Sequence, residues 1–379
     1  MQTNNINKYI VGVWRPLTTL MTDDDHKEDE NVTNSNAASK ALEKYLNSFL
    51  INDENRHSHS QSRLNFPRIK CCGTSRSLYC TECSKLLIEK ECLPSSIQKG
   101  ALDLPFNLDV ILSDRRLSAT GFHALVLLRS SQKQQRQNLK YNMHHGADAG
   151  VDINADADNG ADTDTDADAD ADSSEPLDSE IGVENERVRL FDTEKGDTVP
   201  PYQPLNANDV DIHDTYVLFP SDNSVPLSSV AHQIKRLVVL DCKWTKSGTQ
   251  QRIPEIAHLP KVHLNNAPKE SFYWRWHNAG DGMCSTLEAI YYAAVEVFDS
   301  CDDQGQRQRQ DGGERREAML DLMWLFGIQR AKTALGAKKE GKPSPFSKDG
   351  KDMQRDLRRT EKGSEKHLQD ISLGRRELK

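Results

Sequence analysis

Short apolar runs bounded by polar or turn residues are the main pattern along this chain, and each run predicts a strand. The runs cover residues 107–113, 123–129, 215–219, 236–241 and 261–264. Residues 237–240 are apolar at every position, which is typical of a central parallel strand that is covered on both faces. We therefore expect a mainly parallel sheet.

Helical periodicity is clearest near the C-terminal end of the chain. From Ser285 onward, apolar residues recur on one face, and Ser285 and Glu288 have the S-x-x-E spacing of a capping box. A second helix is expected over 316–335 and a short one over 41–50. Strands that alternate with helices predict an α/β domain whose mainly parallel sheet is flanked by helices. Such sheets bind ligands at the carboxyl ends of their strands, where Asp241 is expected to lie.

The charge of the chain is unevenly distributed. Its 379 residues carry 49 Lys+Arg and 58 Asp+Glu, a net charge of −9, but residues 147–197 alone hold 18 acidic and three basic residues. A strand made of this Asp-Ala alternation would present only like charges on one face, so we expect a disordered, solvated insert. A calcium-binding repeat is the less favoured alternative, because the run lacks regularly spaced glycines.

Polar composition also predicts disorder over most of 21–62 and over 300–315, and the tail from residue 330 is basic, with 15 Lys+Arg against eight Asp+Glu. Apolar runs are too short for a membrane span, and the N-terminus lacks the pattern of a signal peptide. Eight unevenly placed cysteines do not suggest a disulfide scaffold, so we expect a reducing compartment, in which clustered cysteines are metal candidates.

One cysteine cluster has the composition of a structural zinc site. It consists of four thiols within 13 residues, Cys71, Cys72, Cys80 and Cys83. The adjacency of the first two departs from the usual C-x2-C spacing. The alternative is an incomplete knuckle in which only Cys72, Cys80 and Cys83 are well placed.

Three further segments are candidates for chemistry. Asp241 and Trp244 follow a buried strand and would suit proton transfer and base stacking, although a turn and a core role are the alternatives. The helix start at Ser285 would suit an anion, although simple capping also explains it. The stretch 272–277 interleaves aromatic with basic residues, which favours either RNA contact or a core strand edge. The chain contains no Walker A, G-x-S-x-G or H-E-x-x-H motif.

Several motifs in a common order resemble the DTW-domain family, the tRNA-uridine aminocarboxypropyltransferases. They are the knuckle (72–83), LDLPFNLDVIL (102–112), ATGFHA (119–124), YVLFP (216–220), RLVVLDCKW (236–244) and FYWR with STLEAIYY (272–292). The resemblance implies a fold related to the knotted SPOUT-type methyltransferases and S-adenosylmethionine as donor. It also implies transfer of the 3-amino-3-carboxypropyl group to N3 of a D-loop uridine, at position 20, which forms acp3U and releases 5′-methylthioadenosine.

The resemblance also assigns roles to residues. It implies catalytic roles for Asp241 and Trp244, with Asp241 as base or donor-orienting group, and RNA contacts for Arg275 and Lys243. The implied donor-binding residues are Thr120, Phe219, Pro220, Ser285, Thr286, Glu288 and Ala289. Three departures stand out: Lys243 replaces a threonine, Ile69 replaces the first knuckle cysteine, and residues 111–112 are Ile-Leu where the family has His-Pro.

These observations give a disordered segment (1–63), a knuckle (64–100), a DTW domain (101–335) interrupted at 147–197 and 300–315, and a basic tail (336–379). The expected partner is tRNA, without a membrane or a stable protein partner, and the expected location is the nucleus, with the cytoplasm as the alternative. Two rival interpretations are a catalytically impaired tRNA-binding relative and a zinc-knuckle interaction protein that uses its acidic insert.

Overall fold

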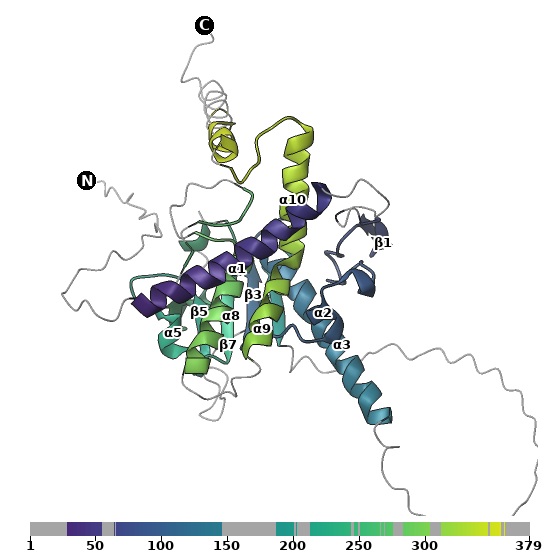
Figure 1. The fold of residues 1–379 in the computed structure, drawn as a ribbon. Coiled ribbons are helices and arrows are strands. Elements are labelled where there is room, and N and C mark those ends of the chain that lie inside the picture. Colours follow the sequence, from purple (N-terminus) through teal and green to yellow (C-terminus); the bar gives the residue numbers. More distant parts are fainter. Residues whose placement is uncertain are drawn as a thin grey trace, which may run out of the picture.

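A sheet of six parallel strands forms the centre of the molecule (Figure 1). It is seen in a computed structural model that describes residues 29–54, 64, 66–145, 187–200, 202, 213–243, 246–248, 251–265, 267–268, 270–275, 283–303, 312–347, 349–357 and 360. The strand order is β4-β3-β7-β5-β8-β6, which confirms the predicted α/β class. The strands are β3 (Asn107–Leu112), β4 (Val188–Asp192), β5 (Thr215–Leu218), β6 (Val225–Pro226), β7 (Arg236–Asp241) and β8 (Lys261–His263).

Four of the five predicted strands, β3, β5, β7 and β8, are confirmed. β3 lies between β4 and β7, and Leu112 at its end pairs with Asp192 on one side and Asp241 on the other. The carboxyl ends of three strands are therefore level with one another. A separate antiparallel hairpin, β1 (Ile69–Cys71) and β2 (Thr74–Arg76), carries the first cysteines.

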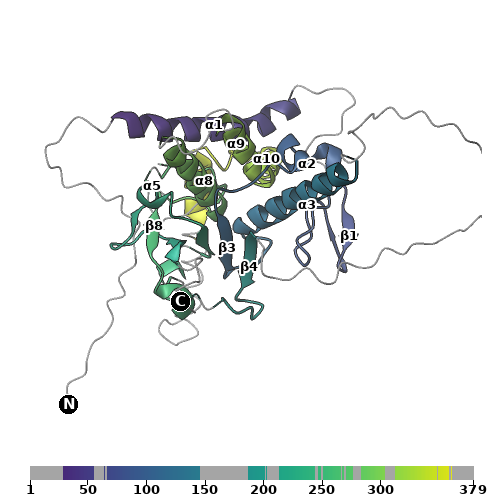
Figure 2. The same ribbon diagram turned by 90° about the horizontal axis from the view of Figure 1, so that it is seen from below.

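The helices are α1 (Asp29–Glu54), α2 (Ser95–Lys99), α3 (Gly121–His145), α5 (Leu227–Val230), α7 (Pro254–Ala257), α8 (Thr286–Asp303), α9 (Gly312–Leu320) and α10 (Trp324–Lys339), with short 3-10 turns η1 (Lys90–Cys92) and η4 (Asp321–Met323). The long helices α1, α8, α9 and α10 are gathered on one face of the sheet (Figure 2), whereas the short α7 packs Ile256 into a smaller cluster on the other face. Leu108, Val110 and Leu112 of β3 point to the face of the long helices and join the main core cluster, whereas Ile111 points to the other face and the smaller cluster. This alternation follows from the two-residue period of a strand.

The strand predicted at 123–129 is wrong, because these residues lie inside α3. The run from Phe122 to Leu128 is buried at every position, so it shows no polar face of helical period. A short, uniformly apolar run has the same pattern in a buried strand and in a buried helix. The helix expected at 316–335 is interrupted by η4, so it forms α9 and α10 instead.

The short helix predicted at 41–50 is confirmed, but it is longer than expected and extends into flanking residues that we expected to be disordered. This helix, α1, covers 26 residues and buries Leu42 and Leu46, while Phe49 packs so closely on Gly327 that a Cβ there would lie 2.7 Å from its ring. Its apolar stripe is narrow, and the polar remainder dominates the composition. Strand β4 lies within the predicted insert 147–197. It is ordered because it pairs with β3 in the sheet. The Asp-rich stretch itself, and with it the calcium alternative, lies outside the described residues.

A buried ionic network crosses three strands on the sheet face that the large helices leave open. Asp109 of β3 has no exposed surface, and Arg189 contacts both its oxygens, at 2.8 and 2.6 Å. Arg236 of β7 lies 2.8 Å from one of them, and the Tyr202 hydroxyl also donates a hydrogen bond to Asp109. A carboxylate that is buried away from solvent needs such partners, so this group of side chains holds β4 and β7 on either side of β3.

We expect Asp109→Ala to reduce the free energy of unfolding by about 3–5 kcal/mol, because the substitution leaves two guanidinium groups without their carboxylate. Urea denaturation measures the change. The control is Asp103→Ala, which breaks an exposed ion pair with Arg187 and should cost no more than about 1 kcal/mol. Equal losses for the two variants would contradict this account of the network.

Candidate active site

Asp241 lies where the ends of two strands meet the beginnings of two helices. It is the last residue of β7, and its side chain is 6% exposed. The backbone N–H of Gly121, the first residue of α3, donates a 2.5 Å hydrogen bond to its Oδ2. A second hydrogen bond comes from the side chain of Thr286, the first residue of α8. The positive ends of both helix dipoles are thus directed at this carboxylate.

The protonation of Asp241 is tuned to near-neutral pH. Burial raises the pKa of Asp241 from its ordinary value of 3.8 to about 6. The hydrogen bonds from Gly121 and Thr286 lower the pKa, and the negative charge of Asp114 raises it. A carboxylate with a pKa in this range exchanges a proton readily under physiological conditions. Perturbed carboxylates in such positions are candidates for function.

Gly121 is required for this close approach. A Cβ at this position would lie 2.6 Å from Oδ2 of Asp241 and 3.1 Å from both Cγ2 of Thr286 and Cγ1 of Val110. A side chain would therefore push α3 away from the strand ends. In the sequence this glycine is marked only by its place in the ATGFHA motif (119–124), where a Thr-Gly pair lies directly before a long apolar run.

The predicted capping box at the beginning of α8 is confirmed. Glu288 is fully buried, and one of its oxygens accepts hydrogen bonds from the backbone N–H (2.8 Å) and hydroxyl (2.7 Å) of Ser285. It also accepts hydrogen bonds from the hydroxyl of Ser271 and the N–H of Phe272, each at 2.7 Å. Burial raises the pKa of Glu288, which these hydrogen bonds counteract. Four donors fill the acceptor sites of a carboxylate, so Glu288 fixes residues 271–272 to α8.

Two further backbone N–H groups near the start of α8 also have partners within the chain. Oγ1 of buried Thr120 accepts a 3.4 Å hydrogen bond from the N–H of Leu287, and the carbonyl of Ser285 accepts one from Ala289 at 2.9 Å. Thr120, Ser285 and Thr286 are therefore brought together with Asp241, as predicted for a donor site. Binding of a donor by these residues stays a prediction.

The aromatic segment 272–275 lies beside the same carboxylates. Burial raises the pKa of the Tyr273 hydroxyl, and the positive charge of Arg275 opposes the rise. The charges of Asp241, Asp114 and Glu288 raise it further, which places Tyr273 near all three. Within the aromatic stretch 272–277, the sequence alone does not distinguish Tyr273 from its neighbours. Its position follows from a contact between segments that are distant in the chain.

The other predicted residues are more dispersed. Phe219 and Pro220 follow β5 at the same edge, but Phe219 packs on the smaller cluster across the sheet from Asp241. Lys243 and Arg275 are exposed, as expected of residues that contact a large substrate, and Ala289 is half-buried. Trp244 lies outside the described residues.

The four predicted cysteines form a compact cluster. Their sulfur atoms all lie within 4.8 Å of one another, with Cys71 3.9 Å from Cys72 and 3.6 Å from Cys83. Four thiolates around a tetrahedral zinc ion would be about 3.8 Å apart. Cys72 has a φ of 47°, in the left-handed region, which turns the chain so that adjacent cysteines face the same point. The cluster is therefore complete, and the incomplete-knuckle alternative does not fit it.

The backbone around Cys80 supports a thiolate. Burial raises the pKa of Cys80, but hydrogen bonds from the backbone of Cys83 and Glu82 outweigh it and lower the pKa to about 7. All four donors are sulfurs in a closed arrangement. This donor set is typical of a structural rather than a catalytic zinc site.

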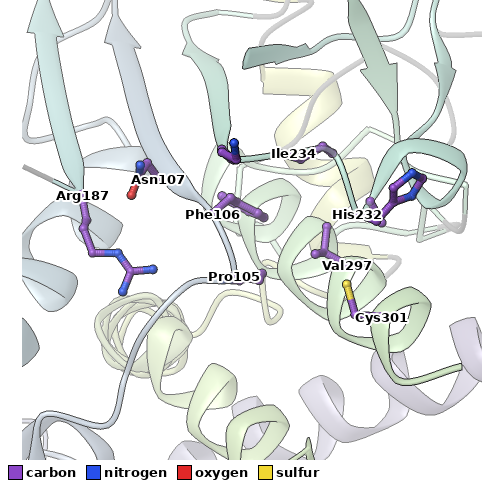
Figure 3. A pocket seen from close by; sticks show the side chains of 10 residues that line it. Pro105, Phe106, Asn107, Arg187, His232, Ile234, Val297 and Cys301 are labelled. Atoms are coloured by element: carbon purple, nitrogen blue, oxygen red, sulfur yellow. The ribbon is translucent and has the colours of Figure 1, made fainter. Parts of the chain in front are cut away.

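A cavity of about 340 Å³ is lined by Asn107 and Arg187 (Figure 3). It lies at the amino-terminal ends of the strands, whereas Asp241 is at a carboxyl end. Asn107 at the start of β3, Arg187 before β4 and Lys235 before β7 line the cavity. Arg187 and Lys235 form ion pairs with Asp103 and Asp214. The charged groups of the cavity are thus engaged with the protein itself.

These observations define a class of α/β protein. Its parallel sheet has a buried carboxylate at the carboxyl edge, and a four-cysteine knuckle is joined to this domain. The profile of the DTW domain matches residues 77–326, well over half of the chain, and the protein belongs to the DTW-domain family. The family is consistent with a role in tRNA modification. No curated protein and no solved structure matches the chain. None of the described helices is long and apolar enough to cross a membrane.

Segments outside the matched range also pack on the domain. In α1, the Ser39 hydroxyl lies 3.0 Å from the Tyr292 hydroxyl of α8. In the helix at 349–357, the side-chain amide of Gln354 donates a 3.3 Å hydrogen bond to the carbonyl of Trp274. The aromatic segment beside the site is thus held from two sides, by Glu288 and by the C-terminal helix.

The Asp241 carboxylate predicts a pH-dependent difference in stability between the wild type and Asp241→Asn. From pH 3.8 to about 6 the folded state retains a proton that the unfolded state loses, so the stability of the wild type falls as pH rises and is then constant. Asn does not ionise. The pH-dependent part of the difference in unfolding free energy, which favours the variant, should reach about 3 kcal/mol at pH 7.5 and about half of that at pH 5.

Urea denaturation at both pH values measures this difference. Asp222→Asn, at an exposed turn position, is the control and should show no such pH dependence. A difference between Asp241→Asn and the wild type that does not change with pH would mean that Asp241 ionises normally.

Proposed function

We propose that this protein is a tRNA-uridine aminocarboxypropyltransferase that uses S-adenosylmethionine to modify N3 of a D-loop uridine, at position 20 by family resemblance. The observation that carries the proposal is the Asp241 carboxylate, buried at the meeting point of α3 and α8 with a pKa of about 6. Membership of the DTW-domain family supports the same conclusion.

The chemistry requires a base of this kind. The N3–H of uridine is a weak acid, and Asp241 accepts its proton, which makes the nitrogen a nucleophile. N3 forms a bond to the γ-carbon of the donor while the bond between that carbon and the sulfonium sulfur breaks. The electron pair stays on sulfur, so neutral 5′-methylthioadenosine leaves and the uridine becomes acp3U. In an alternative role, Asp241 orients the ammonium group of the donor.

The surrounding residues shape the site in this proposal. Thr120, Ser285 and Thr286 set the beginnings of α3 and α8 around the donor, with Ala289 in the same turn of α8. Glu288 acts through residues 271–272, which it holds in place by two hydrogen bonds. Exposed Arg275 and Lys243 face the phosphates of tRNA, which attracts cationic side chains. Trp244 is expected to stack on the donor adenosine or on the target base.

We further propose that Cys71, Cys72, Cys80 and Cys83 hold one structural zinc ion. The sulfur spacing supports this assignment. Zinc bound by four thiolates has no open coordination position, so its contribution is to fold the knuckle.

Metal analysis of the purified protein should find about one zinc ion per chain. Cys80→Ser should lose this zinc and expose the knuckle to proteolysis, because three thiolates bind the ion more weakly. Cys92→Ser, which removes an exposed thiol outside the cluster, should retain it. Zinc that remains after Cys80→Ser, or a wild type without zinc, would refute the site.

The enzymatic proposal predicts release of 5′-methylthioadenosine when the purified protein is mixed with S-adenosylmethionine and unmodified tRNA. Asp241→Asn should lower the rate on the order of 10²–10⁴-fold, because the amide accepts no proton. Chromatography of the released 5′-methylthioadenosine measures the rate. The variant keeps the shape of the site, so the loss is chemical.

Asp222→Ala should behave as the wild type in this assay.

One alternative function is a catalytically impaired tRNA-binding relative. It is favoured by the exposed Lys243, which comes shortly after Asp241 and stands where the family has a threonine. Tight tRNA binding without donor binding or methylthioadenosine release by the wild type would establish that alternative and refute the enzyme. The basic tail leads us to propose a nuclear location, with the cytoplasm as the alternative.

A further inference from the structure

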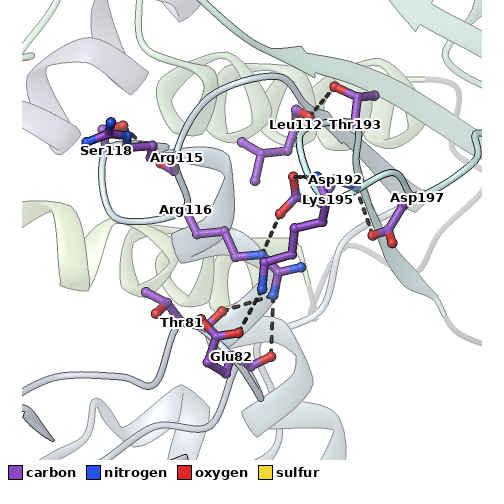
Figure 4. Close-up of polar contacts among 10 residues, drawn as sticks. All are labelled: Thr81, Glu82, Leu112, Arg115, Arg116, Ser118, Asp192, Thr193, Lys195 and Asp197. Atoms are coloured by element: carbon purple, nitrogen blue, oxygen red, sulfur yellow. Dashed lines mark hydrogen bonds and ion pairs between the residues drawn. The ribbon is translucent and has the colours of Figure 1, made fainter. Parts of the chain in front are cut away.

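Arg116 connects the cysteine cluster to the loop that enters the candidate active site. It lies in residues 113–120, between β3 and α3, and its side chain is 14% exposed. Its Nη1 donates hydrogen bonds to the carbonyls of Thr81 (2.9 Å) and Glu82 (3.3 Å), the two residues between Cys80 and Cys83. Figure 4 shows the guanidinium reaching from its loop to this turn.

The other side of the guanidinium is fixed to the sheet. Its Nε lies 2.7 Å from Oδ2 of Asp192, which ends β4 and is 3% exposed at its side chain. The turn after β4 is itself bonded to β3, because the hydroxyl of Thr193 donates a 2.9 Å hydrogen bond to the carbonyl of Leu112. Lys195 adds an ion pair with Glu82 at 2.7 Å. Arg116 therefore joins three segments: the cysteine turn, the loop 113–120 and the end of β4.

The loop that Arg116 holds leads directly to the site. Thr120 contacts the start of α8, and Gly121 donates its N–H to Asp241. A second contact runs in parallel, because the Tyr79 hydroxyl, next to Cys80, lies 3.1 Å from Nε2 of His123 in the first turn of α3. The cysteine turn thus touches both the loop and the helix start that surround the Asp241 carboxylate.

We infer that Arg116 is a positioning residue that couples metal binding by the four cysteines to the order of the active-site loop. A metal ion fixes the turn between Cys80 and Cys83, and with it the two carbonyls that Arg116 needs. Without the ion, only contacts within the chain hold this turn. Arg116 then keeps its ion pair with Asp192 but loses its hydrogen bonds to the carbonyls of Thr81 and Glu82. The loop 113–120 then loses its direct attachment to the cysteine turn. This coupling rests on the proposed zinc site and links it to the proposed function.

Hydrogen exchange of peptides that cover 113–122 tests the coupling without any enzymatic assay. In the wild type, chelation of zinc should speed exchange of this segment on the order of 10-fold. Arg116→Ala should exchange quickly even with zinc bound, and chelation should add little. Arg115→Ala, at the exposed neighbouring position, should behave as the wild type. Metal analysis of Arg116→Ala should show that the zinc is retained, which separates loss of coupling from loss of the knuckle.

Arg116→Lys provides a second variant with the charge retained. A lysine ammonium can pair with Asp192 but does not reproduce the planar fork that also reaches the two carbonyls, so protection should be intermediate. Equal protection of the loop in Arg116→Ala and the wild type would overturn the inference. So would the same response to chelation in both proteins, or the absence of metal from the wild type.

Binding of S-adenosylmethionine distinguishes this inference from the proposed function. Calorimetry should show weaker donor binding in Arg116→Ala than in the wild type and Arg115→Ala, in proportion to the loss of loop protection. If no protein binds the donor while the exchange pattern is as expected, the proposed function fails and the coupling stands. If Arg116→Ala binds the donor as the wild type does and its loop is protected, the coupling fails and the proposed function stands.

Discussion

The buried carboxylate of Asp241 is the constraint around which the site is arranged. A charge in this position needs donors, and the fold supplies them from the first residues of α3 and α8. α3 can approach because residue 121 is a glycine. α8 is capped by Ser285 and Glu288, and Glu288 in turn holds the aromatic segment. One electrostatic requirement thus sets the positions of two helices and of the segment beside them.

The contrast with Asp109 shows why Asp241 is the candidate for chemistry. Both carboxylates are buried on the central strands β3 and β7, on opposite faces of the sheet. Asp109 is neutralised by two arginines, the usual arrangement of a structural charge. Among the described residues no ion pair is formed with Asp241, and burial raises its pKa to about 6. An unpaired carboxylate reduces stability, and proteins commonly retain such a cost at functional sites.

The sequence predicts those features that depend on local pattern. The unbroken apolar run at 237–240 identified a central strand, Ser285 and Glu288 identified the beginning of α8, and the spacing of thiols identified the cysteine cluster. The same reasoning failed for 123–129, where burial on all sides removes the helical period. Gly121 and Arg116 were not identified as site residues, and Tyr273 was identified only as a member of the stretch 272–277, because their roles arise from contacts between segments far apart in the chain. Local pattern gives residue types and elements, whereas long-range contact gives the site.

The most direct test of the central claim is mass spectrometry of tRNA nucleosides from cells that lack this protein. We predict that acp3U disappears from the D-loop of the substrate tRNA, and that wild-type protein restores it while Asp241→Asn does not. Unchanged acp3U in the absence of the protein, or full restoration by Asp241→Asn, would show that Asp241 does not carry out this reaction.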